Sequence, residues 1–209
     1  LADSVNERYG GGCVAISYDS RNTSREFARE SAGVLAANGI TAYIYDRLMP
    51  TPMLSFAVRE LKAKAGIMIT ASHNPAIYNG YKAYGPDGCQ MTTEDATAVY
   101  DRIRKVDIFG GIKTKDFNEG LADGSIKYIS KFIIEQYYNE VLKCKTSKTV
   151  CEAYPIRVVY SPLNGTGNEP VRRIFFFFFV NDAFAVAERG RPDAGSRPCP
   201  SPTPATRGP

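Results

Sequence analysis

The stretch AGIMITASHNPAIYNGYKAY, residues 65–84, decides the fold because it joins two strand-like runs through an irregular loop. Residues 65–70 form an apolar run ending in threonine, which is typical of a strand buried on both faces of a sheet. Residues 81–84 predict a second, shorter strand. The loop between them is rich in asparagine, glycine and proline, and it holds the chain's single histidine, His73. The stretch therefore predicts a strand, a loop with the only imidazole, and another strand.

Strand and helix patterns alternate on both sides of this stretch. Strands are predicted at 13–18 and 41–45, and helices at 24–39, 52–64 and 92–105. Ser24 is expected to cap the first of these helices, Gly39 to end it, and Pro52 to stand near the start of the next. Strands alternating with helices over short connections predict an α/β fold, a three-layer α/β/α sandwich around a mixed, mostly parallel sheet.

The periodicity also predicts how the chain is divided. Residues 1–106 form a first domain, and 107–127, where the apolar pattern fades among glycines, are expected to be a linker. A helix at 130–144 and a strand-turn-helix unit after it predict an incomplete second domain of the same type over 128–187. The proline-rich residues 188–209 predict an irregular tail.

Composition narrows the function. The chain has 209 residues, 44% of them hydrophobic, with a net charge of +4. Its basic residues are spread out instead of forming a nucleic-acid patch, and its longest apolar run, Ile174 to Val180, is far shorter than the roughly 18 residues of a membrane span. Five cysteines without CxxC pairs indicate neither a disulfide framework nor a zinc site, and no signal peptide is seen, so a cytoplasmic protein is expected.

Ser72 and His73 allow several interpretations. A hydrolase pair is disfavoured because sequence neighbours usually point their side chains apart and no G-x-S-x-G elbow is present. A lone loop histidine is often a structural hydrogen-bonder, and Asn79 and Gly80 in the same loop favour a turn with positive φ. Position favours function, because Ser72 follows the carboxyl end of a predicted parallel strand, where open α/β sheets bind ligands.

Four motifs in order carry a family resemblance. TASHNP followed by YNGYK and GPDG resembles the phosphoserine loop of the α-D-phosphohexomutases, the phosphoglucomutase and phosphomannomutase superfamily. Three further segments agree: ISYDSRNTSREFA (16–28), PTPMLSFAV (50–58) and VVYSPLNGTGNEPVRRI (158–174). The resemblance covers roughly residues 12–174 and is strongest to the bacterial phosphoglucomutases, which implies interconversion of glucose 1-phosphate and glucose 6-phosphate through a 1,6-bisphosphate.

The resemblance implies roles for four residues. Ser72 would carry the phosphoryl group and, through its phosphate, be one ligand of Mg²⁺. His73 would shuttle a proton, and Lys82 would stabilise the transferred group. Arg21 would be a charge clamp on phosphate, because a guanidinium does not readily lose its proton. A phosphosugar substrate and glucose 1,6-bisphosphate as activator are implied, with no nucleic-acid or membrane partner.

The sequence also departs from the family. The Asp-x-Asp-x-Asp-Arg metal loop, the sugar loop and the distal phosphate loop do not occur in the 209 residues, and five phenylalanines stand at 175–179. These departures predict an N-terminal fragment that is inactive alone. A non-enzymatic binding or regulatory module, and a mutase for mannose or pentose phosphates, remain the alternatives.

Overall fold

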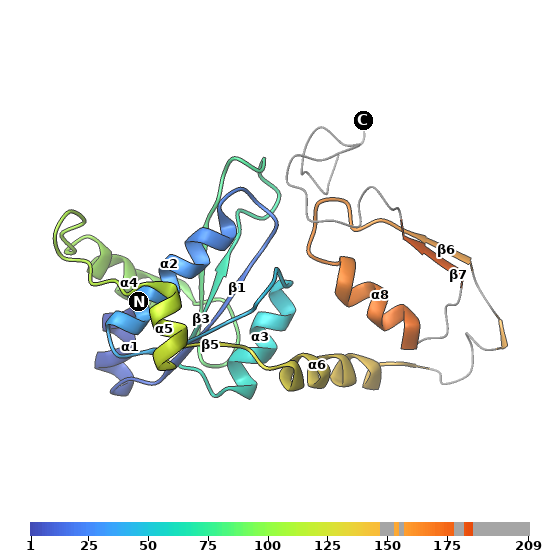
Figure 1. The fold of residues 1–209 in the computed structure, drawn as a ribbon, viewed down its shortest axis with the longest axis horizontal. Coiled ribbons are helices and arrows are strands. Elements are labelled where there is room, and N and C mark those ends of the chain that lie inside the picture. The colour runs from blue at the N-terminus through green and yellow to red at the C-terminus, as the bar shows by residue number, and fades with distance from the viewer. Residues whose placement is uncertain (147–152, 155–156, 178–181, 186–209) are drawn as a thin grey trace.

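The computed structural model describes residues 1–146, 153–154, 157–177 and 182–185 (Figure 1). Its helices and strands are, in chain order, α1 (Ala2–Tyr9), β1 (Cys13–Tyr18), α2 (Ser24–Ala37), β2 (Thr41–Ile44), α3 (Thr51–Glu60), β3 (Ala65–Ile69), β4 (Tyr81–Tyr84), α4 (Thr93–Ile103), α5 (Phe117–Asp123), β5 (Ile126–Tyr128), α6 (Lys131–Lys143), β6 (Arg157–Tyr160), α8 (Asn168–Phe177) and β7 (Asp182–Ala185). The predicted strands and helices of the first hundred residues are confirmed.

The first sheet has five strands in the order β4-β3-β1-β2-β5. Strand β1 pairs in parallel with β2 and β3, and β5 pairs in parallel with β2, whereas β4 runs antiparallel to β3. The predicted mixed, mostly parallel sheet is therefore confirmed. Because β1 and β3 point the same way, their carboxyl ends meet at one edge.

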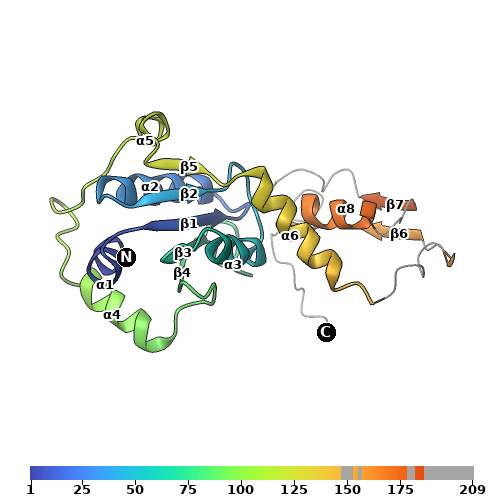
Figure 2. The same cartoon turned by 90° about the horizontal axis from the view of Figure 1, so that it is seen from below.

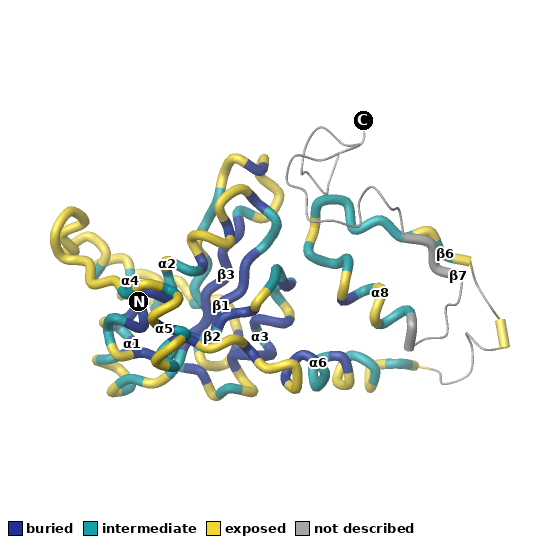
Figure 3. Tube along the Cα trace, in the orientation of Figure 1, coloured by how far each residue is buried: buried dark blue, intermediate teal, exposed yellow. Residues whose placement is uncertain are grey.

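Helices cover both faces of this sheet (Figure 2). Val14, Ile16 and Tyr18 of β1 enter one buried cluster with residues of α1 and α2, while Ala15 enters a second cluster with residues of α3 and α6. This alternation follows from the period of two along a strand. It explains why the strand sequences read as continuous apolar runs, and why the central strands are buried along their length (Figure 3).

A glycine lets α3 pack tightly on the sheet. A Cβ atom at Gly66 of β3 would lie 2.7 Å from Cγ2 of Val58 and 3.1 Å from Cβ of Tyr84. Any larger residue would have to push α3 or β4 away. The position of α3 affects the cavity at the carboxyl ends of β1 and β3, because Thr51 at the start of this helix lines that cavity.

The predicted linker at 107–127 is corrected by the structure. It contains α5 and most of β5, and β5 is the edge strand of the first sheet. The helix has seven residues and the strand three, so neither repeats its apolar pattern often enough to be recognised. Backbone pairing with β2 and the burial of Ile126 hold the strand in place.

Helix α6 also belongs to the first sandwich, although the sequence placed it in a second domain. Its residues Ile133, Ile134 and Tyr138 are buried in the cluster that contains α3. The sequence predicted the helix itself correctly. A helical pattern shows that one face is apolar, but it does not indicate which sheet that face packs against. The first packed unit therefore extends beyond residue 106.

A second, two-stranded parallel sheet is formed by β6 and β7, with α8 beside it. Two ion pairs join α8 to the first unit: Arg47 with Glu169 and Arg173 with Glu135. The predicted tail at 188–209 lies outside the described residues. Of the five phenylalanines at 175–179, the first three form the end of α8 and the last two lie outside the described residues. Within the described part of the chain, no helix has the length and apolar character needed to cross a membrane.

Candidate functional site

A cavity of about 180 Å³ lies at the carboxyl ends of β1 and β3. Its walls come from residues 19–21 after β1, from Thr70 and Ser72 after β3, from Lys82 in β4, and from residues 164–166 before α8. This is the sheet edge at which open parallel sheets bind their ligands. The structure therefore places Ser72, Lys82 and Arg21 in the lining of one cavity, whereas His73 is not among its lining residues.

Ser72 is exposed and has an unusual backbone. Its φ of 58° lies in the left-handed region, which non-glycine residues rarely adopt. Its backbone N–H donates to Oγ1 of Thr70 at 3.0 Å. The Oγ atom of Ser72 lies 3.0 Å from Nδ1 of His73. The expectation that these neighbours point apart is wrong, because the left-handed backbone at Ser72 interrupts the alternation of an extended chain.

Arg21 is placed differently from the predicted phosphate clamp. Its side chain is only 5% exposed, and Nε donates to the carboxylate of Asp19 at 3.1 Å. Nη1 donates to the carbonyl oxygens of Asn74 and Pro75, and Nη2 donates to the carbonyl oxygen of Ser72. A tightly curved loop turns these carbonyls inward, where they need donors, and a guanidinium supplies five N–H groups. These bonds tie Arg21 to the backbone of the loop.

Lys82 also lines the cavity, and unlike Arg21 its charged group is not bonded to the loop. It is half-buried in β4, opposite Met68 of β3, and its ammonium makes no hydrogen bond or ion pair with any residue that the structure describes. Because β4 runs antiparallel, its beginning lies beside the end of β3. The short strand thereby places Lys82 in the lining of the same cavity as Ser72.

Sequence reasoning missed Asp19 and Thr70. The hydroxyl of Thr70 donates to Oδ2 of Asp19 at 2.6 Å, and the hydroxyl of Ser24 donates to Oδ1 at 2.7 Å. Ser24 is thus the first buried residue of α2 and not its cap, which is Thr23. The available signal was a polar residue directly after each of two apolar strands, at the edge where ligands bind.

Asn79 and Gly80 also act differently from the prediction, because neither has a positive φ. The side-chain amide of Asn79 donates to Oγ of Ser24 at 2.8 Å and to the carbonyl oxygen of Asn22 at 3.1 Å. At Gly80 a Cβ atom would lie 2.7 Å from the carbonyl oxygen of Thr70. Gly80 is therefore required for close approach of two backbone segments, and the strained φ falls on Ser72 instead.

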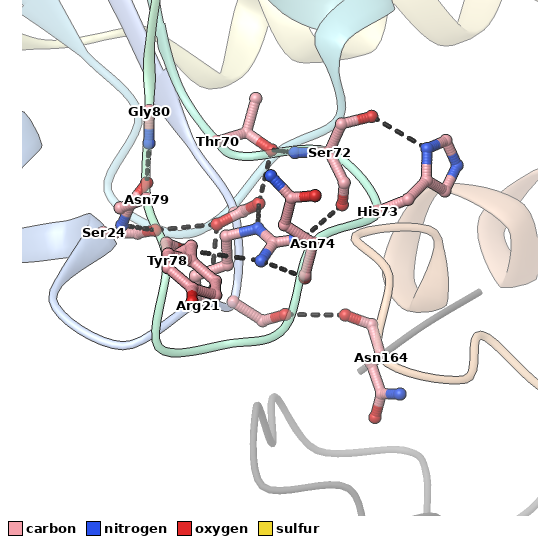
Figure 4. Close-up of polar contacts among 12 residues, drawn as sticks. Arg21, Ser24, Thr70, Ser72, His73, Asn74, Tyr78, Asn79, Gly80 and Asn164 are labelled. Atoms are coloured by element: carbon pink, nitrogen blue, oxygen red, sulfur yellow. Dashed lines mark hydrogen bonds and ion pairs between the residues drawn. The ribbon is translucent and has the colours of Figure 1, made fainter. Parts of the chain in front are cut away.

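Residues 164–166 close the cavity from the second unit. The hydroxyl of Ser20 donates to the carbonyl oxygen of Asn164 at 2.6 Å (Figure 4). This loop contains Gly165. Its place on the cavity wall could not be read from the sequence, because it depends on contact between distant segments.

The described residues do not fit a complete Mg²⁺ site. Among them, no group of three or more histidine, cysteine, aspartate or glutamate side chains could hold a metal ion. The carboxylate of Asp19, which borders the cavity, already accepts four hydrogen bonds. An oxygen of a phosphorylated Ser72 is the ligand that the family resemblance implies for this part of the chain.

Comparisons with known proteins agree with this geometry. The family described as phosphoglucomutase/phosphomannomutase, alpha/beta/alpha domain I, matches residues 1–108. A phosphoglucomutase of Staphylococcus saprophyticus is 42% identical over 166 residues, 79% of this chain and 30% of the relative. A phosphoglucomutase of Staphylococcus aureus is 48% identical over 106 residues, 51% of this chain and 19% of the relative.

A solved structure supports the same assignment. The crystal structure assigned as a phosphomannomutase from Thermus thermophilus has a TM-score of 0.74 and 26% identity, covering 91% of this chain and 40% of that one. The chain belongs to the phosphoglucomutase/phosphomannomutase family, and the predicted resemblance to bacterial phosphoglucomutases is confirmed. It spans about 30% of the length of a curated relative such as the S. saprophyticus protein.

Proposed function

We propose that this chain carries the phosphoserine-bearing part of a phosphoglucomutase, which interconverts glucose 1-phosphate and glucose 6-phosphate through a 1,6-bisphosphate. The observation that carries the proposal is the exposed Ser72 hydroxyl on a cavity wall shared with Lys82, with His73 Nδ1 at 3.0 Å. Glucose is proposed over mannose and pentose because the bacterial relatives are named phosphoglucomutases.

In the proposed reaction, a phosphorylated Ser72 donates its phosphoryl group to a free hydroxyl of the sugar phosphate. The bond between the serine oxygen and phosphorus breaks while a sugar oxygen–phosphorus bond forms, the sugar hydroxyl releases its proton to water, and the departing serine oxygen takes up a proton. His73 is close enough to give a proton to the departing Ser72 oxygen and, in the reverse direction, to take it. Turning the bisphosphate over and returning its other phosphoryl group to Ser72 completes the exchange.

Charge favours the same assignment. A phosphoserine carries about −1.5 to −2 charges at neutral pH, so its site needs a nearby cation. Lys82 lines the cavity and supplies one. Arg21 holds the loop's carbonyl oxygens with its N–H groups, and its own charge is paired with the carboxylate of Asp19. For the complete protein the proposal includes Mg²⁺, glucose 1,6-bisphosphate as activator, a phosphosugar substrate and a cytoplasmic location.

We further infer that β6, α8 and β7 begin a second α/β domain. The two strands are parallel and α8 lies between them in the chain, which is the arrangement of a βαβ unit. In this proposal the second domain closes the cavity through residues 164–166.

A non-enzymatic binding or regulatory module is the second candidate. It is favoured by one observation, that no group of metal-binding side chains occurs among the described residues. Such a module would keep the sandwich and bind a phosphosugar without accepting its phosphoryl group. The two candidates therefore differ in whether Ser72 becomes covalently labelled.

The test is incubation of the 209-residue chain with glucose 1,6-bisphosphate labelled in its phosphoryl groups, followed by intact-mass measurement and peptide mapping. We expect one phosphoryl group on Ser72, no label in Ser72→Ala, and normal labelling in Ser20→Ala, which changes a second serine of the same cavity. An unlabelled wild-type chain, or label that persists in Ser72→Ala, would contradict the phosphoserine proposal.

A further inference from the structure

The carboxylate of Asp19 is the centre of the hydrogen-bond network behind Ser72. Its Oδ1 atom accepts from the backbone N–H of Arg21 at 3.0 Å and from the hydroxyl of Ser24 at 2.7 Å. Its Oδ2 atom accepts from Nε of Arg21 at 3.1 Å and from the hydroxyl of Thr70 at 2.6 Å. The side chain is 13% exposed. A carboxylate has about four acceptor positions, so this one is fully used.

The first connection from Asp19 to Ser72 runs through Thr70. An ionised carboxylate only accepts hydrogen bonds, so the Thr70 hydroxyl must donate its single hydrogen to Asp19. Its lone pairs then face the backbone N–H of Ser72, which donates to Oγ1 at 3.0 Å. Asp19 thus fixes the orientation of the hydroxyl that holds the amide of Ser72.

The second connection runs through Arg21. The same carboxylate that binds Nε of Arg21 sets the plane of the guanidinium, and Nη2 donates to the carbonyl oxygen of Ser72. Both backbone polar groups of Ser72 are therefore tied to Asp19 through one intermediate side chain each. This matters because Ser72 has a left-handed φ of 58°, a conformation that is unfavourable for a residue with a Cβ atom.

We propose that Asp19 is a positioning residue for phosphoryl transfer, fixing the Ser72 hydroxyl in the cavity by way of Thr70 and Arg21. Asp19 touches neither the sugar nor the phosphoryl group in this proposal. The inference deepens the function proposed for Ser72 and rests on it. A phosphoryl carrier must present its oxygen in line with the incoming group, so a small displacement of the loop slows transfer even when the cavity still binds its ligand.

Three variants of the chain isolate this role. Asp19→Asn keeps the shape of the side chain but replaces one acceptor oxygen by an NH₂ group. The donors that bonded to that oxygen then face another donor and lose their acceptor. Thr70→Val removes the connecting hydroxyl and leaves Asp19 bound to Arg21 and Ser24, whereas Thr70→Ser restores the hydroxyl. Asp46→Asn, which changes an exposed carboxylate paired with Arg47, is the matched control.

Two measurements are made on each variant: amide hydrogen exchange of the segment 70–80, and the rate at which labelled glucose 1,6-bisphosphate phosphorylates Ser72. In Asp19→Asn and Thr70→Val we expect exchange in this segment to rise about tenfold with β1 and β3 still protected. We expect labelling to slow by about tenfold to a hundredfold, at an unchanged bisphosphate concentration for half-maximal rate. Thr70→Ser and Asp46→Asn should match the wild type.

The outcomes separate this inference from the proposed function. Unchanged labelling in Asp19→Asn and Thr70→Val would overturn the positioning role, even if both variants lost thermal stability. Should Asp19→Asn fail to fold, Thr70→Val and its rescue by Thr70→Ser decide the question. Should the wild type accept no label, the proposed function fails, and exchange in 70–80 alone decides whether Asp19 holds the loop.

Discussion

Nδ1 of His73 lies 3.0 Å from Oγ of Ser72, although the two residues are neighbours in the chain. The contact depends on the left-handed backbone at Ser72, which the surrounding network holds in place. A proton can therefore pass between the two side chains without a third group. Both residues are exposed, and Ser72 lines the cavity, so a ligand there can reach the Ser72 hydroxyl.

Replacing His73 should slow the chemistry and leave the fold intact. We expect His73→Ala to reduce the rate of Ser72 phosphorylation by about 10²–10⁴-fold, because that is the usual contribution of a positioned acid–base group. His73→Gln keeps a hydrogen-bonding side chain but cannot carry the proton, and should be nearly as slow. The measurement is single-turnover labelling, with the thermal midpoint as the control. Full activity of His73→Gln would reduce the role of His73 to hydrogen bonding.

Lys82 should contribute mainly to binding of the anion. We expect Lys82→Met to raise the bisphosphate concentration needed for half-maximal labelling by about tenfold. The substitution removes a positive charge from the cavity lining that no described residue neutralises. Lys82→Arg should recover part of the affinity, and the wild-type affinity should weaken as salt is added. Lys131→Met, at the exposed start of α6, controls for a general change in charge. An affinity for bisphosphate that does not change in Lys82→Met would contradict the prediction.

The sequence was informative where a signal was local or repeated. Strands β1 and β3 were predicted because their buried faces give continuous apolar runs, and Ser72 because its motif follows one of them. It failed where the deciding interaction was distant or involved backbone atoms. β5 is held by pairing with β2, and Arg21 by carbonyl oxygens of a loop more than fifty residues away, as in its bond to Asn74. Such contacts leave no periodic pattern to read.

Gly80 should be sensitive to a single added methyl group. Its Cβ atom would lie 2.7 Å from the carbonyl oxygen of Thr70, and a backbone atom there cannot move without disturbing Asp19's network. We expect Gly80→Ala to destabilise the fold by about 1–3 kcal/mol. Chemical denaturation measures this directly. Gly110→Ala, whose Cβ would meet only the side chain of Asp107, should be near neutral, and equal effects of the two changes would refute the close-approach argument.

Multiple turnover by the 209-residue chain alone should be very slow. We expect less than about one ten-thousandth of the rate of a complete relative, because phosphoryl transfer depends on charge stabilisation and one arginine-type contact can contribute 10³–10⁵ in rate. In the part of the chain that the structure describes, the cavity offers Lys82 and no group of metal-binding side chains. A coupled glucose 6-phosphate assay with Mg²⁺ and bisphosphate measures the rate. Turnover within about tenfold of the relative would contradict the prediction.

Shortening the chain should show where the first folding unit ends. A variant ending at residue 105 loses β5 and α6, and with them the burial of Ile126, Ile133, Ile134 and Tyr138. Each such side chain contributes about 1.5–3 kcal/mol when buried, so the loss is roughly 6–12 kcal/mol, comparable to the whole stability of a domain of about 5–15 kcal/mol.

We therefore expect the variant ending at 105 to be unfolded or aggregated, whereas a variant ending at 146 should unfold cooperatively. Circular dichroism during urea titration distinguishes the two, and Ile133→Ala in the longer variant should cost about 2–5 kcal/mol if α6 is docked in solution. If the shorter variant unfolded cooperatively with a stability within about 1 kcal/mol of the longer one, β5 and α6 would be dispensable and the boundary predicted near 106 would stand.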